Sequence, residues 1–268
     1  MRLALILLFT TIPLRVISGQ DLDVPFYVTE PEVVEGMLDL AGVGPGDYLI
    51  DLGSGDGRIV IAAAKRGALG HGVDLDPQRN IEANRNARDA GVHDRVIFLE
   101  EDLFETDFSQ ATVITMFLLG TVNLRLRPVL LSRLRPGTRV LSHTFDMGDW
   151  KPDRREVIGI RPVYLWVIPA RVDGDWRWRI GDSNFTMTVQ QEFQEITVTI
   201  HTGKDVLSIE SSELTGDRIA VAAFNEKNGT RYLFSGKVNE GMITGFAQVR
   251  SDEAAALETW SASRRQDP

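Results

Sequence analysis

The sequence predicts a doubly wound, mostly parallel Rossmann-like α/β sheet, followed by a small all-β antiparallel domain that can close into a barrel. Three observations carry this prediction. From Tyr48 onward, short apolar runs alternate with amphipathic stretches, which is the pattern of strand–helix units in a parallel sheet. A glycine-rich turn follows the first of these runs. Such a turn is typical of the point where a strand passes into a helix beside a ligand. Beyond Pro169, runs with a period of two follow one another and no convincing helix separates them.

The first half of the chain predicts strands and helices in alternation. The apolar run 48–52 follows the turn Pro45-Gly46 and is expected to form a buried strand. The later parallel strands are expected at 72–75, 96–99, 111–117 and 139–142. Helices are expected at 58–66, 77–90 and 122–134, each of them ended by glycine, with Pro77 at a first helical position. The run 163–168 is expected to add an antiparallel edge strand.

The second half of the chain predicts eight short antiparallel strands, separated by turns such as Asn228-Gly229 and Glu240-Gly241. They are expected at 176–180, 185–191, 196–201, 206–211, 218–224, 232–238, 242–249 and 257–262. Trp176 and Trp178 are two residues apart and share one side of their strand, where core packing is favoured over a ligand platform. Substrate presentation, oligomerisation and covering of the sheet remain open as the role of this half.

Three parts are therefore expected: a targeting segment at 1–20, an α/β domain at 21–170 and an antiparallel β domain at 171–268. The first part begins with Arg2, continues with an apolar run from Leu3 to Ile12 and reaches small residues at Ser18-Gly19, as in a signal peptide. An uncleaved N-terminal anchor, which would be the only membrane contact, and a misplaced start codon are the alternatives. An exported protein, periplasmic or secreted, is expected if the signal is real, and a cytoplasmic one otherwise.

Composition excludes several classes of function. A net charge of −9 argues against nucleic acid as the main partner, because phosphate binding needs a basic face. One local basic patch is conceivable, although a solvated helix face is the favoured interpretation of its residues: Arg125, Arg127, Arg133, Arg135 and Arg139. The chain has no cysteine and only four scattered histidines, so disulfides, a cysteine nucleophile and a metal site are not expected.

The glycine-rich turn Gly53-Ser54-Gly55-Asp56-Gly57 lets a ligand approach the backbone where a side chain would collide. A dinucleotide fingerprint requires a third glycine where this chain has Arg58, which weakens a nicotinamide site. Asp74 follows Gly53 by twenty-one residues and is placed to accept hydrogen bonds from two ribose hydroxyls. Asp51, directly before the glycines, suits the ammonium group of S-adenosylmethionine (SAM). Asp102 is placed to reach an adenine amine, with a helix N-cap as the alternative.

These motifs, with Asp51-Leu-Gly-Ser-Gly-Asp-Gly-Arg58 followed by Gly72-Val-Asp74-Leu-Asp76, resemble those of class I SAM-dependent methyltransferases. The resemblance is strongest to seven-strand, non-SET protein lysine methyltransferases, both the histone H3 lysine-79 type and the mitochondrial type that modifies the ATP-synthase c-subunit. It covers roughly residues 23–169. The segment 24–29 resembles the loop that such enzymes fold over the cofactor, and 118–128 also resembles the family.

The resemblance implies a set of cofactor-binding positions that surround methionine, ribose and adenine. They are Thr29, Asp51, Gly53, Ser54, Gly55, Asp56, Asp74, Asp76, Asp102 and Leu103. Phe117 is implied to line the methyl-transfer channel. The chain departs from the family at Ser54, where cysteine is frequent, and at Gly120, where close relatives have proline, which puts the shape of the substrate entrance in doubt.

His143 and Asp146 follow the fifth strand and are expected at the same edge of the sheet, as candidates for lining the substrate pocket. A structural loop with a buried aromatic residue and an aspartate turn is the alternative. Methyl transfer to an amine needs alignment more than a general base, so no catalytic residue is named.

The expected function is SAM-dependent methyl transfer to a protein lysine or a small molecule. The alternative is an exported SAM- or nucleoside-binding or structural protein that keeps the methyltransferase fold without catalysis. It is motivated by the conflict between an export signal and a cofactor that is made in the cytoplasm.

Overall fold

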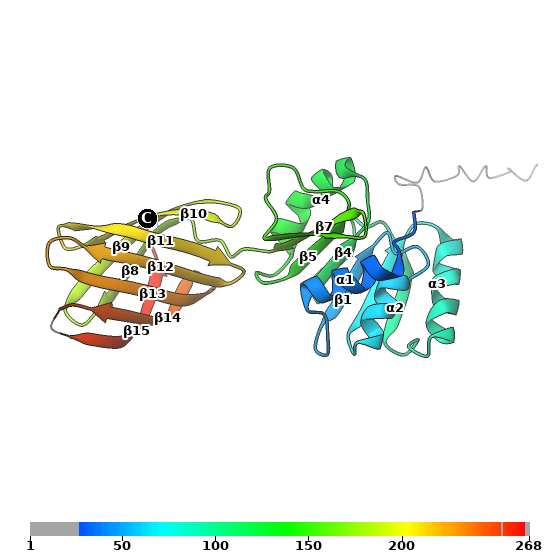
Figure 1. The fold of residues 1–268 in the computed structure, drawn as a ribbon, viewed down its shortest axis with the longest axis horizontal. Coiled ribbons are helices and arrows are strands. Elements are labelled where there is room, and N and C mark those ends of the chain that lie inside the picture. Colours follow the sequence, from blue (N-terminus) through cyan, green and yellow to red (C-terminus); the bar gives the residue numbers. More distant parts are fainter. Residues whose placement is uncertain (1–26, 253, 266–268) are drawn as a thin grey trace, which may run out of the picture.

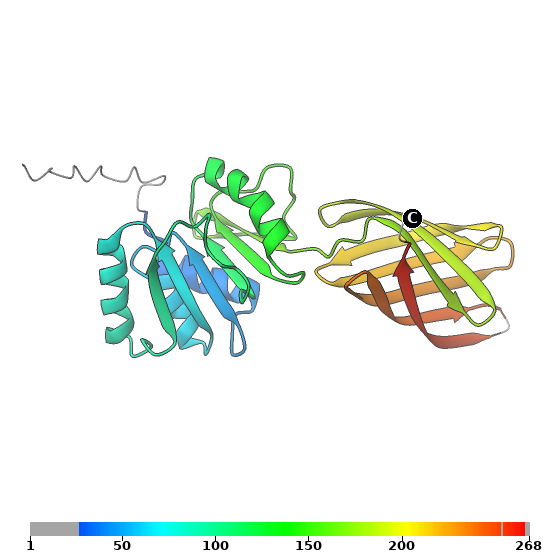
Figure 2. The same ribbon diagram turned by 180° about the vertical axis from the view of Figure 1, so that it is seen from behind.

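The computed structural model describes residues 27–252 and 254–265, which form a layered α/β unit and a β-barrel placed end to end (Figure 1 and Figure 2). The predicted targeting segment 1–20 and residues 24–26 of the predicted covering loop lie outside the described residues. Within the described residues, no helix combines the length and the apolar character needed to cross a bilayer.

The α/β unit is built on a seven-stranded sheet with the strand order β3-β2-β1-β4-β5-β7-β6. The strands are β1 (Tyr48–Leu52), β2 (Leu69–Asp74), β3 (Val96–Glu100), β4 (Val113–Met116), β5 (Arg139–His143), β6 (Arg154–Ile158) and β7 (Arg161–Val167). The first five are parallel to one another. This arrangement confirms the predicted Rossmann-like fold class.

The antiparallel end of the sheet differs from the prediction. Strand β7 pairs with β5 on one side and with β6 on the other, so the predicted edge strand is an interior strand and β6 is the edge. Strand β6 was not predicted, because its residues Arg-Arg-Glu-Val-Ile are exposed or only partly buried and show no apolar alternation. A solvated edge strand lacks the hydrophobic signal on which sequence-based prediction depends.

Among the residues that the structure describes, four helices cover the two faces of the sheet: α1 (Pro31–Ala41), α2 (Arg58–Lys65), α3 (Pro77–Asp89) and α4 (Gly120–Arg133). Residues of α1, α2 and α3 share one hydrophobic core with Leu49, and residues of α4 share another with Ile50. Leu49 and Ile50 are neighbours on β1, and successive strand residues point to opposite faces. Helices α1–α3 therefore lie on one face and α4 on the other. Helix α1 was not among the predicted elements.

The barrel consists of eight antiparallel strands in the closed order β10-β11-β12-β13-β14-β15-β8-β9. They are β8 (Gly174–Ile180), β9 (Ser183–Glu192), β10 (Glu195–Thr202), β11 (Asp205–Thr215), β12 (Arg218–Asn225), β13 (Thr230–Asn239), β14 (Met242–Arg250) and β15 (Ala255–Arg264). All eight strands were predicted. Trp176 and Trp178 are 1% and 5% exposed, so the prediction that they belong to the core is confirmed. Aromatic side chains fill the interior with them, among them Phe185, Phe234 and Trp260.

Candidate functional site

The turn between β1 and α2 has the backbone conformation that its glycines predict. Gly53, Gly55 and Gly57 have φ angles of 76°, 51° and 79°, which lie in the left-handed region. A Cβ atom on Gly57 would collide with the ring of Phe98, so both space and conformation require glycine there. The backbone N–H groups of Gly53 and Ser54 each donate a 2.9 Å hydrogen bond to the carbonyl of Val73. The turn is thereby fixed against the end of β2.

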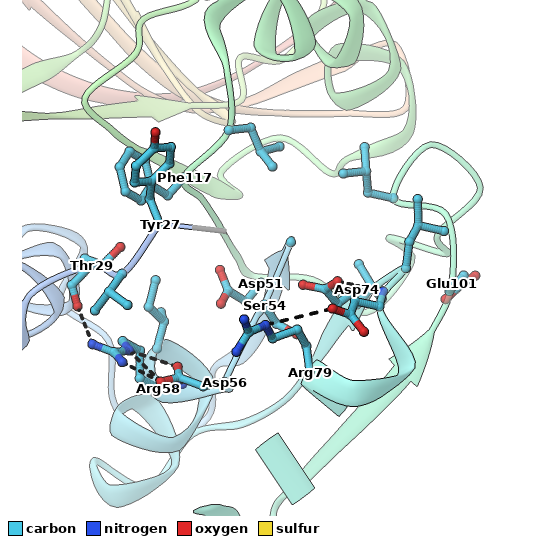
Figure 3. Close-up of a pocket in the computed structure, with 18 of the residues that line it drawn as sticks. Tyr27, Thr29, Asp51, Ser54, Asp56, Arg58, Asp74, Arg79, Glu101 and Phe117 are labelled. Carbon is cyan, nitrogen blue, oxygen red and sulfur yellow. Dashed lines mark hydrogen bonds and ion pairs between the residues drawn. The ribbon is translucent and has the colours of Figure 1, made fainter. Parts of the chain in front are cut away.

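Next to this turn lies a cavity of about 250 Å³, at the carboxyl ends of β1, β2 and β4 (Figure 3). Of the predicted site residues, those that line it are Thr29, Asp51, Gly53, Ser54, Asp56, Asp74, Asp76, Asp102, Leu103 and Phe117. Gly55, His143 and Asp146 are not among the lining residues. In Figure 3, Tyr27 and Phe117 lie toward one end of the cavity and Asp74, Arg79 and Glu101 toward the other.

Asp51 is a buried carboxylic acid at the end of β1, 3% exposed. Its Oδ1 accepts a 2.7 Å hydrogen bond from the hydroxyl of Thr115 on β4. Burial, with a smaller contribution from the negative charges of Asp74 and Asp56, raises the pKa of Asp51 to about 7. A cationic group bound at this position would compensate for the cost of ionising Asp51. The chemistry of the site therefore fits the ammonium group of SAM.

Asp74 is held in place by the two segments on either side of it. Its Oδ2 accepts a 2.9 Å hydrogen bond from the N–H of Gly55, and its Oδ1 accepts one of 2.9 Å from the N–H of Asp76. Gly55 thus contributes by orienting Asp74. Each carboxylate oxygen keeps capacity for a further hydrogen bond, as recognition of a ribose diol requires. Asp76 caps helix α3 by accepting the N–H of Gln78 at 2.8 Å.

Asp102 does not cap a helix, because the residues that follow it, 103–105, form a turn. Its Oδ1 accepts a 2.9 Å hydrogen bond from the N–H of Phe104, which is a local aspartate turn. The apolar side chains of Val73, Leu75 and Leu103 line the same cavity. Apolar side chains together with one fixed carboxylate form a site of the kind that an adenine ring and its exocyclic amine require.

The described part of the predicted covering segment, residues 27–29, lines the cavity and is held by Arg58. The Arg58 Nη1 donates a 2.9 Å hydrogen bond to the carbonyl of Thr29 (Figure 3). The same guanidinium forms an ion pair with Asp56. Burial alone would raise the pKa of Asp56, but hydrogen bonds and charge pairing with Arg58 outweigh it and lower that pKa. From the sequence, Arg58 counted against a dinucleotide site and belonged to the motif that resembles methyltransferases, but its contact with this segment was not predicted.

His143 and Asp146 lie in different surroundings. His143 is buried behind the cavity wall, with its ring centroid 4.1 Å from that of Phe117. Asp146 is exposed, and its Oδ1 accepts a 3.1 Å hydrogen bond from the N–H of Gly148. The structure therefore brings His143, but not Asp146, into contact with residues that line the cavity.

Several lining residues had not been named as site residues: Tyr27, Val28, Arg58, Ile59, Val73, Leu75, Arg79, Glu101 and Leu118. Tyr27 and Val28 belong to the predicted covering segment, and Leu75 directly follows Asp74, so proximity in sequence could have indicated them. Arg79 lies in the first turn of α3, 4.0 Å from Asp76. No sequence signal distinguishes it from a surface arginine.

Charge distinguishes this cavity from a dinucleotide site. Six carboxylates line it, those of Asp51, Asp56, Asp74, Asp76, Glu101 and Asp102, against the two guanidiniums of Arg58 and Arg79. Such a surface suits the ammonium and sulfonium charges of SAM and opposes a pyrophosphate. In the parts of the chain that the structure describes, no group of three or more histidine or acidic side chains is arranged to hold a metal ion.

Comparisons with known proteins agree with this geometry. A family model described as the ANTKMT methyltransferase domain matches residues 51–154. A protein-lysine N-methyltransferase from Saccharolobus islandicus is 44% identical over 155 residues, which are 54% of this chain and 94% of that protein. The mouse ATP synthase C-subunit lysine N-methyltransferase is 32% identical, over 61% of this chain and 67% of its own length.

A solved structure from Salinibacter ruber, described as an RNA methyltransferase in complex with S-adenosyl-L-homocysteine, is 52% identical to this chain. It has a TM-score of 0.54 and covers 55% of this chain and 96% of its own. The barrel strands β8 to β15 lie outside the residues that the family model matches.

Proposed function

This chain belongs to the family of class I SAM-dependent methyltransferases that includes the protein-lysine N-methyltransferase of Saccharolobus islandicus, and we propose that it methylates lysine side chains of a protein. SAM-dependent methyl transfer is the activity of this family, and lysine is the acceptor that we propose. What supports lysine is a relative of that activity that is 44% identical across 94% of its own length.

Each part of the cavity has a role in this chemistry. SAM supplies a methyl group on a sulfonium sulfur. A neutral amine attacks the methyl carbon in line, the bond from carbon to sulfur breaks, and S-adenosylhomocysteine leaves with the electron pair. Asp51 would hold the ammonium group of SAM, Asp74 the ribose hydroxyls and Asp102 the adenine amine. Residues 27–29, held by Arg58, would exclude water from the reacting atoms.

The charge of the cavity also suits a basic acceptor. The acidic side chains that line it outnumber the arginines, so the cavity as a whole attracts a lysine side chain. The apolar side chains of Phe117 and Leu118, which also line it, would favour the neutral amine over ammonium by removing water. A lysine drawn in as a cation would therefore react as an amine after releasing its proton to solvent, without a dedicated general base.

RNA is the second candidate acceptor, because the Salinibacter ruber protein is described as an RNA methyltransferase. The charge of this chain is unfavourable to it, at −9 overall. Three arginines of the conceivable basic patch contact groups of the protein itself: Arg127 pairs with Asp149, Arg139 pairs with Asp47, and Arg125 lies 4.3 Å over the ring of Phe104. These contacts leave RNA as the less favoured acceptor.

The acceptor can be identified with methyl-labelled SAM and a cell extract divided into protein and RNA. We expect label in protein, on peptides whose lysines have gained about 14 mass units per methyl group, and no label after the extract's lysines are blocked by acetylation. Label that resists protease and is released by ribonuclease would overturn the proposal in favour of RNA. An Asp74→Ala variant serves as the control for label that does not depend on the cavity.

A further inference from the structure

His143 is a buried imidazole that lies between two residues lining the cavity without lining it itself. It is the last residue of β5 and is 1% exposed. Its Nδ1 lies 3.2 Å from the hydroxyl oxygen of Thr29, which is 114 residues away in the sequence. Its ring packs against Phe117, which directly follows β4, at an interplanar angle of 40°. One side chain thus contacts both the covering segment and the cavity wall.

We propose that His143 is a positioning residue for methyl transfer, which holds the covering segment at Thr29 in a fixed position relative to the cavity wall at Phe117. Thr29 is fastened at two points. Its carbonyl accepts the hydrogen bond from Arg58 on the α2 side, and its hydroxyl contacts His143 on the β5 side. Two fastenings from different elements fix the orientation of the segment as well as its distance from the cavity.

The surroundings of His143 suit a permanent anchor. Burial, with a smaller contribution from the positive charge of Arg161, lowers the pKa of His143 to about 4, although the negative charge of Glu30 acts in the opposite direction. The ring is therefore neutral near pH 7. Its Nε2 is buried and has no hydrogen-bond partner among the described residues. The backbone turns sharply directly after it, at Thr144 with φ 73°, and the Thr144 N–H donates a 2.8 Å hydrogen bond to the carbonyl of Pro162.

Residues 27–29 line the cavity, so loosening them would weaken cofactor binding and expose the reacting atoms to water. It would also disturb the alignment on which in-line methyl transfer depends. This consequence concerns SAM itself and is independent of the identity of the acceptor. It can therefore fail or succeed separately from the proposal of lysine methylation.

The test uses four variants of the full chain. Thr29→Val removes the hydroxyl with little change in shape, and Thr29→Ser keeps a hydroxyl. His143→Phe keeps a ring against Phe117 but removes the hydrogen bond, and His143→Asn keeps a polar group near the position of Nδ1. The exposed His93, varied to Phe, is the matched control. Calorimetry gives the Kd of SAM, and hydrogen exchange gives the protection of the backbone amides at 27–30 with and without SAM.

We expect Thr29→Val and His143→Phe each to raise the Kd of SAM by about fivefold to tenfold, the effect of one lost hydrogen bond, and to abolish the SAM-dependent protection of residues 27–30. Their double variant should lose no more than either single variant, because both remove the same interaction. Thr29→Ser and His143→Asn should retain most of the SAM-dependent protection of residues 27–30.

Unchanged affinity and protection in Thr29→Val would overturn the proposal, as would effects of the two single variants that simply add. A purely structural role for His143 would lower the thermal midpoint without coupling to Thr29. If His143→Phe does not fold, the comparison of Thr29→Val with Thr29→Ser still shows whether the Thr29 hydroxyl contributes to SAM affinity and to the protection of residues 27–30.

Discussion

The indole Nε1 of Trp150 donates a 2.8 Å hydrogen bond to Oε1 of Gln194, and so joins the segment after β5 to the turn between β9 and β10 of the barrel. Gln194 in turn donates from Nε2 to the carbonyl of Lys151 at 2.7 Å. The neighbouring Phe193 stacks on Trp150 with ring centroids 5.8 Å apart. The barrel turn therefore packs against the same hydrophobic core that α4 covers.

This contact predicts that the barrel stabilises the α/β unit. We expect Gln194→Ala to lower the free energy of unfolding of the α/β unit by about 1–2 kcal/mol, because it leaves the buried Trp150 indole N–H without its partner. Thermal unfolding of the full chain, followed by calorimetry, measures the change. Gln190→Ala, at an exposed position of β9, is the matched control and should have little effect. Equal effects of the two variants would show that the contact contributes nothing.

The raised pKa of Asp51 predicts a pH dependence of cofactor binding. Ionised Asp51 attracts the ammonium group of SAM and protonated Asp51 does not. Since its pKa is about 7 without ligand, the affinity for SAM should rise as pH increases toward 7 and level off above it, changing by roughly tenfold per pH unit below 7. Calorimetric titration between about pH 5.5 and pH 8.5, which brackets this pKa, tests the dependence. Asp51→Asn should bind weakly at every pH, and a wild-type affinity that is flat with pH would contradict the assignment.

The same pKa predicts the sign of a stability change in the ligand-free protein. The folded state holds a proton on Asp51 up to about pH 7, whereas the unfolded chain releases it near the ordinary aspartate value. The contribution of Asp51 to stability is therefore full below the unfolded pKa and decreases as pH rises toward 7. Denaturant unfolding of wild type and Asp51→Asn across this window measures the difference between them. The free energy of unfolding of Asp51→Asn, relative to that of wild type, should increase as pH rises.

Asp74 is expected to account for a large part of the cofactor affinity. We predict that Asp74→Asn raises the Kd of SAM by about tenfold to a hundredfold, because the amide offers one acceptor oxygen in place of two and loses the charge. The carboxylate also orients the glycine turn through Gly55, so some loss of order in residues 53–57 should accompany the change. Asp94→Asn, at an exposed position of the same unit, is the control. Similar Kd values for the two variants would argue against a ribose site at Asp74.

The two tryptophans of β8 form a matched pair. The Nε1 of Trp176 donates a 2.7 Å hydrogen bond to the carbonyl of Val172, whereas the buried Nε1 of Trp178 has no partner among the described residues. Trp176→Phe should therefore cost about 1 kcal/mol more of barrel stability than Trp178→Phe, since only the first leaves a carbonyl without its hydrogen bond. Urea unfolding, followed by the near-ultraviolet signal of the barrel, gives the comparison. A larger loss for Trp178→Phe would refute this explanation.

The gathering of Asp51, the glycine turn and Asp74 beside one cavity was predictable, because these residues lie close together in the sequence. Asp51, the glycines and Asp74 span one strand–turn–helix–strand unit, in which the local chain path brings them together. The eight barrel strands were predictable for a similar reason, because each shows alternation and a turn at its end. Strand β6 was not predictable, because an exposed edge strand shows neither.

By itself, the sequence determined the Rossmann-like sheet, the glycine turn with its acidic neighbours, and therefore the cofactor. Periodicity and local turn chemistry act over a few residues, so one chain is enough to reveal them. Only the tertiary structure decided that Arg58 and His143 fasten Thr29, that Asp146 lies outside the cavity and that Gln194 joins the barrel to Trp150. The hydrogen bonds of Thr29 with Arg58 and His143 join residues 29 and 114 positions apart. Such pairs are selected by the packing of the whole fold, which no local pattern encodes.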